Sequence, residues 1–184
     1  MILIFETSIL ITWFLAFSFE KWRDNKLEQL ILLSSLFTTF IMEVINDVFF
    51  GPFGMVYPQS FFFLKPFKFP IPIVLTGSLY CWLLHILSLK FSKLIFKKRQ
   101  LTIGYPLTIM ILLNSWYFIE LIGQKSGYWV RLGGIQYTSL IILLTYFFYF
   151  CFTVPSITFS FFIHNLFNKN KKNAPHIVFE KPSS

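Results

Sequence analysis

Carboxylic acids inside apolar runs are the residues of this sequence with the clearest chemical potential. Glu43 and Asp47 are four residues apart, with Asn46 beside them, in the apolar run 30–50. On a helix this spacing puts the two carboxyl groups on one face. Two such groups in a low-dielectric surrounding should not both be ionised, and a neutral acid beside an ionised one is typical of a proton-donating site. The pattern therefore predicts acid catalysis or a proton relay.

Glu120 repeats part of this pattern later in the chain. Seven residues after it comes Gly127-Tyr128-Trp129, and eight residues after Glu43 comes Gly51-Pro52-Phe53-Gly54. Both acids are thus followed, after about two helical turns, by a glycine and an aromatic residue. The candidate catalytic residues are Glu43, Glu120 and Asp47, and the candidate substrate-binding residues are Asn46, Phe53, Tyr57, Asn114, Tyr128 and Trp129.

Two structural explanations compete with a functional one. The acids, with Glu6 among them, could pair with basic residues of nearby loops, such as Lys65, Lys125 and Arg131. The repeated pattern could be a coincidence, with Tyr128 and Trp129 acting only as interfacial aromatic anchors. Both explanations stay open at the level of sequence.

The elements that must position these acids are membrane helices. The chain has 184 residues, of which 55% are hydrophobic and 13% charged, whereas soluble domains carry about 25% charged residues. Several apolar runs reach the ~20 residues that a bilayer-spanning helix needs. We therefore predict an all-α, polytopic bundle in one domain, residues 1–164, with a polar, disordered tail at 165–184. The five expected spans cover residues 1–19, 30–50, 71–89, 101–123 and 137–163.

Basic residues are divided unequally between the two sides of this topology. Twelve lie in the segments 20–29, 90–100 and the tail, and four lie in the other loops. The positive-inside rule then predicts a cytoplasmic C-terminus and an external N-terminus. We expect the plasma membrane as the location. Because the basic residues flank the spans, they indicate topology and not a nucleic-acid partner. The acids in these cytoplasmic segments are expected to be solvated: Glu20, Asp24, Glu28 and Glu180.

Motifs for metal, cofactor or nucleotide binding do not occur in the sequence. Cys81 and Cys151 both fall in apolar segments without CxxC spacing, and no HExxH, GxGxxG, P-loop or GxSxG pattern is present. Neither a metal nor a cofactor is therefore predicted.

The segment from Glu43 to Pro72 resembles the integral-membrane carotenoid biosynthesis proteins, a family that includes carotenoid hydratases. The resemblance lies in an acid, a Pro52-Phe53-Gly54 element, Tyr57 and a proline-led span at Pro70 and Pro72. Glu120 with Gly127-Tyr128-Trp129 is similar to a second acidic element of that family. The likeness covers residues 43–137; here Gly51 directly precedes Pro52, Tyr57 falls one position late, and the family usually has more spans.

The resemblance implies an enzyme that hydrates or cyclises an isoprenoid C=C bond in the membrane. Its substrate would be an apolar isoprenoid, protonated by Glu43 or Glu120, with aromatic faces of Phe53, Tyr57, Tyr128 and Trp129 towards the resulting cation. The alternative is a non-catalytic membrane protein: a small or proton-linked permease, or a subunit of a larger complex. An enzyme predicts an aromatic-lined cavity open to lipid near Glu43, whereas a permease predicts a polar path that reaches both membrane faces.

Overall fold

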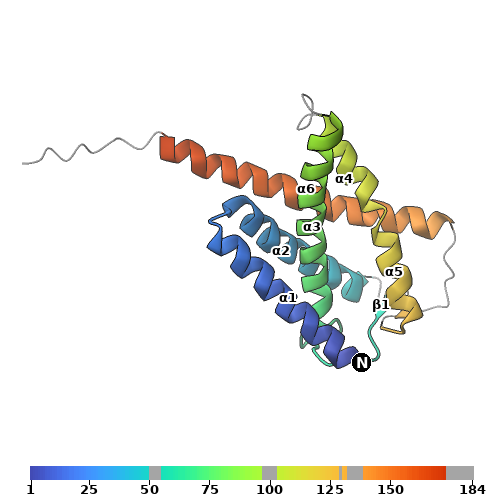
Figure 1. Ribbon diagram of the computed structural model, residues 1–184. Helices are drawn as coiled ribbons and strands as arrows, with labels where there is room; N and C mark the ends of the chain where they lie inside the picture. The colour runs from blue at the N-terminus through green and yellow to red at the C-terminus, as the bar shows by residue number, and fades with distance from the viewer. Residues whose placement is uncertain (50–54, 97–102, 129, 132–138, 173–184) are drawn as a thin grey trace, which may run out of the picture.

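The computed structural model describes residues 1–49, 55–96, 103–128, 130–131 and 139–172. The described part is an assembly of helices, five stretches of which are long and apolar enough to cross a membrane. The prediction of an all-α chain with five candidate spans is therefore confirmed. In Figure 1, α3 stands at the centre, α1 and α2 lie to one side, α4 and α5 to the other, and α6 crosses the bundle.

α1 (Ile2–Trp22) and α2 (Lys26–Phe49) form an antiparallel pair joined by a tight turn. The turn depends on Asp24, whose φ of 50° is left-handed, a conformation that Asp tolerates better than most residues. α1 extends three residues beyond the predicted end of the first span, so Glu20 is helical and not part of a loop.

α3 (Ile71–Phe96) packs closely against α2. It begins at the predicted prolines, since Pro72 occupies the first turn, where a missing N–H costs no helical hydrogen bond. Gly77 allows the close approach, because a Cβ there would lie 2.5 Å from Cγ2 of Thr39. Small residues at such crossings let membrane helices approach each other.

The fourth predicted span consists of two helices, α4 (Tyr105–Leu113) and α5 (Trp116–Lys125). The helices separate at Asn114 and Ser115, where the amide of Asn114 donates to the carbonyls of Met110 and Ile111 at 3.2 and 3.0 Å. The sequence predicted one continuous helix here. Asn competes for backbone groups in this way, which is a weaker signal than proline or glycine.

α6 (Ser139–Lys172) is the longest helix and contains Pro155. It continues to Lys172, past the predicted end of the fifth span at residue 163 and into the segment predicted to be disordered. Residues 173–184, the rest of that tail, lie outside the described part.

Two short strands join the loops at one end of the bundle. β1 (Met55–Val56) pairs antiparallel with β2 (Val130–Arg131), with Val56 opposite Val130. This two-residue ladder connects the loop after α2 to the loop after α5. The two segments that the sequence pattern singled out are therefore neighbours in space.

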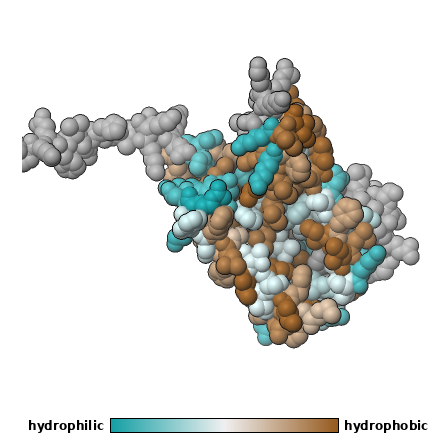
Figure 2. Space-filling model, in the orientation of Figure 1, coloured by the Kyte–Doolittle hydropathy of each residue, from teal (hydrophilic) through white to brown (hydrophobic). Residues whose placement is uncertain are grey.

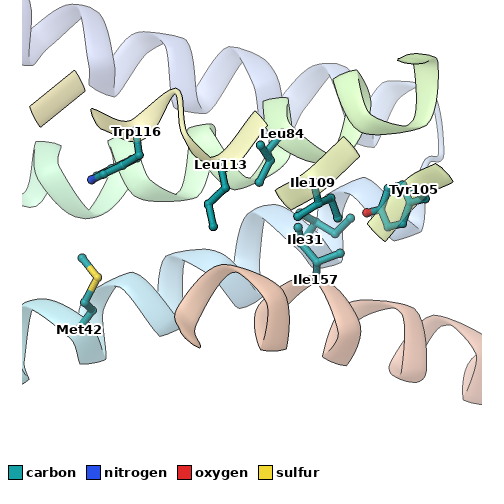
Figure 3. Close-up of a cluster of buried hydrophobic side chains, with 8 residues drawn as sticks. All are labelled: Ile31, Met42, Leu84, Tyr105, Ile109, Leu113, Trp116 and Ile157. Atoms are coloured by element: carbon teal, nitrogen blue, oxygen red, sulfur yellow. The ribbon is translucent and has the colours of Figure 1, made fainter. Parts of the chain in front are cut away.

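The surface and the core both fit a lipid environment. Figure 2 shows hydrophobic residues over much of the visible helical surface, with hydrophilic residues gathered towards the ends of helices. Large apolar side chains such as Leu15 and Leu94 are exposed. Inside, Ile31, Ile109 and Ile157 meet from α2, α4 and α6 (Figure 3).

Candidate functional site

Glu43 is buried at the interior of the bundle near the β1–β2 end. Its side chain is 2% exposed. The Tyr57 hydroxyl donates a hydrogen bond to Glu43 Oε2 at 3.0 Å, and Asn46 also bonds to this carboxyl group. The predicted residues Asn46 and Tyr57 are thus both partners of Glu43.

Glu120 comes from α5 and lies close enough to Glu43 for their charges to interact. Only 1% of its surface is exposed, and Trp116, one turn earlier on the same helix, donates from Nε1 to Oε1 at 3.4 Å. The structure therefore places the two predicted acids together inside the protein and not facing lipid or water.

Glu6 is a third buried acid at this end. The Tyr128 hydroxyl donates to its Oε1 at 2.8 Å and the backbone N–H of Phe61 to its Oε2 at 2.9 Å. The hydroxyl of Ser60 is a further donor to Oε1. Every oxygen of this fully buried carboxyl group has a partner, which is the condition under which a buried acid is tolerated.

Tyr57 and Tyr128 link these acids. The β1–β2 ladder holds their loops together, and the two rings lie 6.2 Å apart in an edge-to-face arrangement. Burial raises the pKa of the Tyr57 phenol well above its usual value, and the neighbouring Glu43 raises it further. Burial and the hydrogen bond to Glu6 likewise raise the pKa of Tyr128. We call Glu6, Glu43, Glu120, Tyr57 and Tyr128 the acid cluster.

Of the four remaining predicted residues, the structure describes Asp47 and Asn114. Asp47 is a turn beyond Glu43, and its charge also interacts with Glu43. Its Oδ2 accepts from the backbone N–H of Lys68 at 3.2 Å. Asn114 is exposed and bonded to its own helix, so it is not brought to the acid cluster. Phe53 and Trp129 lie outside the described residues.

Glu6 and Trp116 were not predicted as site residues. Glu6 is an acid inside a predicted span, and because burying an acid in a membrane is costly, its position already indicated a candidate site residue. Its partner Tyr128 is 122 residues away, and no pattern in the sequence connects the two. Trp116 is four residues before Glu120, a spacing that places both on one helix face.

A small cavity lies inside the bundle, and its lining includes neighbours of the acid cluster but no member of it. Its volume is about 10 Å³, enough for about one water molecule. Met42, which precedes Glu43, and Trp116, which bonds Glu120, both contribute to its wall. The other lining residues include Thr38, Thr39, Tyr80 and Thr153, whose hydroxyl groups make it partly polar.

A second group of buried polar side chains lies at the other end of the bundle, where α1 ends and α2 begins. Nδ1 of His85 is 2.6 Å from the Tyr105 hydroxyl, and its Nε2 is 3.8 Å from Oε1 of Glu28. Glu20 is fully buried and the Glu28 side chain is only 13% exposed, although both were predicted to be solvated. For Glu20, the reason is that α1 continues to Trp22 and puts Glu20 on the buried face with Trp13 and Ala16. We call Glu20, Glu28, His85 and Tyr105 the histidine cluster.

The histidine cluster is incompletely hydrogen bonded. Both carboxylate oxygens of Glu20, Oε2 of Glu28 and Nε2 of His85 have no hydrogen-bond partner, although Arg23 lies 3.6 Å from Glu20. Among the described residues, no group of three or more His, Cys, Asp or Glu side chains is arranged to hold a metal ion.

Comparison with known proteins yields no relative. No family model, no curated protein and no solved structure matches this chain.

Proposed function

We propose that this protein is an integral-membrane enzyme that protonates a C=C bond of an isoprenoid lipid, with hydration or cyclisation as the outcome. The observation that carries the proposal is the pair Glu43 and Glu120, buried and interacting. Neighbouring carboxyl groups away from water favour one protonated and one ionised member, which is the state that general acid catalysis requires.

The parts needed for such a reaction are close to the pair. One of the two acids donates its proton to an alkene carbon, leaving a cation on the adjacent carbon. For hydration, a water molecule adds its oxygen to that cation and returns a proton to the carboxylate, so the enzyme is restored. The water-sized cavity beside Met42 and Trp116 would supply the water, and the rings of Trp116 and Tyr57 would stabilise the cation by about 0.5–2 kcal/mol each.

Orientation and location belong to the same proposal. The twelve-to-four division of basic residues supports a cytoplasmic C-terminus and an external N-terminus in the plasma membrane. The acid cluster would then lie under the outer leaflet. The test uses Gln59→Cys, beside the acid cluster, in a background that lacks other cysteines (Cys81→Ser, Cys151→Ser). In intact cells this cysteine should react with a thiol reagent that cannot cross the membrane. Reaction only after permeabilisation would refute this orientation.

A proton-linked permease is the second candidate, and the histidine cluster is the observation that favours it. Titratable groups at both ends of the bundle are what a proton path needs. Against it, the buried apolar residues Ile31 and Leu32 lie between Glu28 and Ser35 along α2. Leu84, also buried and apolar, lies between Ser78 and His85 along α3. A proton flux into liposomes that is lost in His85→Ala and retained in Glu43→Gln would favour transport over catalysis.

The test of the enzyme is the replacement of each acid by its amide. Glu43→Gln and Glu120→Gln should each lower product formation by about 10²–10⁴-fold, the usual contribution of a general acid. Lipid extracts of cells that make carotenoid and terpenoid precursors are assayed for hydrated or cyclised products. Asp24→Asn is the matched control, because Asp24 is an exposed loop acid with 83% of its side chain accessible. Unchanged products in both amide variants would refute the acid mechanism.

A further inference from the structure

The break between α4 and α5 is completed by a side chain from α3. In a continuous helix the N–H of Tyr117 would bond to the carbonyl of Leu113, but here it donates to the carbonyl of Asn114 at 3.2 Å. The Tyr80 hydroxyl on α3 donates to the Leu113 carbonyl instead, at 3.2 Å, and lies 3.1 Å from Ser115 Oγ. Inside a membrane each backbone polar group needs a partner, so the Tyr80 hydroxyl stabilises the break.

A second joint lies at the other end of α5. Gly127 follows this helix with a φ of 70°, a left-handed conformation that glycine adopts without steric cost. Beyond it, the β1–β2 ladder holds the loop in place. The ten residues of α5 therefore form a short rod between two joints, and hinges in proteins are formed by a few such residues at the ends of elements.

α5 has one face inside the protein and one face towards lipid. Trp116, Glu120 and Gly123 are buried, whereas Phe118 and Ile122 are 64% and 68% exposed. α4 packs chiefly on α3, while the main helix contact of α5 is with α6. α5 can therefore turn at its two joints while the packing of α4 on α3 stays intact.

The acid pair is closed off in this conformation. Glu43 and Glu120 are almost wholly buried, and the cavity lined by Met42 and Trp116 has a volume of about 10 Å³, room for about one water molecule. An isoprenoid in the membrane can touch these acids only when a wall moves. Because α5 carries Glu120 on its inner face and lipid-exposed side chains on its outer face, it is the wall that stands between the acid pair and the lipid.

We propose that α5 is a lateral gate to the acid cluster: it pivots at its two joints, carries Glu120 outward and opens Glu43 to a lipid substrate, and Tyr80 is the latch that holds it closed. The ring of Tyr80 adds to the latch, because it meets the ring of Trp116 edge-to-face with 4.6 Å between the centroids. The purpose of the gate rests on the proposed function. The motion of α5 can be measured without any product.

Cys81 is a natural reporter of opening. It is buried and lines the same cavity as Trp116, whereas Cys151 on α6 is exposed. The full-length Cys151→Ser protein in nanodiscs is treated with a lipid-soluble organomercurial, and mass spectrometry follows the labelling of Cys81. Because a buried thiol reacts through an opened state, the labelling rate follows the population of that state.

Two substitutions weaken the latch from opposite sides. Tyr80→Phe removes the hydroxyl on α3 and should raise the labelling rate about fivefold, the effect of one lost hydrogen bond on an equilibrium. Ser115→Ala removes the partner on the break and should raise the rate by less, since the bond to Leu113 remains; it also covers the case in which Tyr80→Phe does not fold. Tyr105→Phe is the matched control, because it removes a phenol hydroxyl from α4 beside His85, away from the break, and should leave the rate unchanged. An unchanged rate in the latch variants, or an equal rise in the control, would overturn the proposal.

Spin labels show whether α5 is the part that moves. One label replaces Leu15 on α1, on the other side of α3 (Figure 1), and the second replaces either Ile122 on α5 or Ile111 on α4; all three side chains are exposed. In Tyr80→Phe the α1–α5 distance distribution should gain a second, longer distance, and the α1–α4 distribution should stay the same. A change in both distributions, or in neither, would contradict a hinge at the break.

The outcomes separate this gate from the proposed function. If the latch variants label faster and α5 moves, but Glu43→Gln and Glu120→Gln retain full product formation, the gate stands and the acid mechanism fails. If the amide variants lose product formation but labelling and distances are unchanged in Tyr80→Phe, the acid mechanism stands and the gate fails.

Discussion

The two ends of this bundle treat buried acids in opposite ways. In the acid cluster, Glu6 and Glu43 receive hydrogen bonds from tyrosine, serine or backbone donors. In the histidine cluster, both oxygens of the fully buried Glu20 have no such donor. The acids of the acid cluster are therefore held by donors from the protein itself, whereas Glu20 is buried without one, which costs free energy.

The same substitution at both ends should have opposite effects on stability. Glu6→Met removes the acceptor of Tyr128, Ser60 and the Phe61 N–H, and each buried donor left without a partner costs about 1–3 kcal/mol. We expect Glu6→Met to lower the free energy of unfolding by about 3 kcal/mol. Reversible denaturation in mixed micelles measures the change, and a loss below about 1 kcal/mol would show that these bonds are not important for the fold.

Alkaline pH should weaken the acid-cluster end. The pKa values of Tyr57 and Tyr128 are raised in the folded protein by burial and by their neighbouring acids, and the unfolded value is about 10. The folded state therefore holds these protons more tightly, so their contribution to stability is complete below pH ~10 and is lost as the pH rises above it. As the pH rises above ~10, the midpoint temperature of thermal unfolding should decrease in the wild type. It should decrease less in the Tyr57→Phe, Tyr128→Phe double variant. Equal slopes of midpoint temperature against pH in the two proteins would contradict the assignment of this effect to Tyr57 and Tyr128.

The smallest expected effect is at the histidine cluster. Glu20→Met replaces a buried carboxyl group that has no hydrogen-bond donor by an apolar side chain of similar length. Burying a polar group without a hydrogen bond costs about 1–3 kcal/mol, and Arg23, 3.6 Å from Glu20, is half exposed and stays solvated when Glu20 is removed. We therefore expect a gain of about 1 kcal/mol in the free energy of unfolding. The same denaturation experiment measures it. A loss of 3 kcal/mol or more, like that at Glu6, would mean that the contrast between the two ends is absent.

Local patterns in the sequence identified the helices and part of the acid cluster. Apolar runs of membrane length predicted the five candidate spans, and the repeated acid-plus-aromatic pattern singled out Glu43 and Glu120, which are neighbours in the structure. The bond between Glu6 and Tyr128 was not predictable, because it joins α1 to a loop 122 residues later. Such a contact depends on the packing of whole helices and leaves no periodic signal.

Two errors had a local cause. Glu20 was assigned to a charged loop because its neighbours are polar, yet Trp13, Ala16 and Glu20 follow the three- and four-residue steps of one helix face. The break at Asn114 was missed because the residues around it are apolar and neither proline nor glycine is present. For Glu20, the spacing of side chains carried more information than average hydropathy.

The most direct test of proton donation by the acid pair is the reaction in D₂O. If Glu43 or Glu120 protonates an alkene carbon, the acid exchanges with solvent and each product molecule carries one deuterium on carbon that does not wash out in H₂O. Mass spectrometry of the purified product measures this label. The account predicts one carbon-bound deuterium per turnover in the wild type; product formed at full rate without carbon-bound deuterium would contradict it.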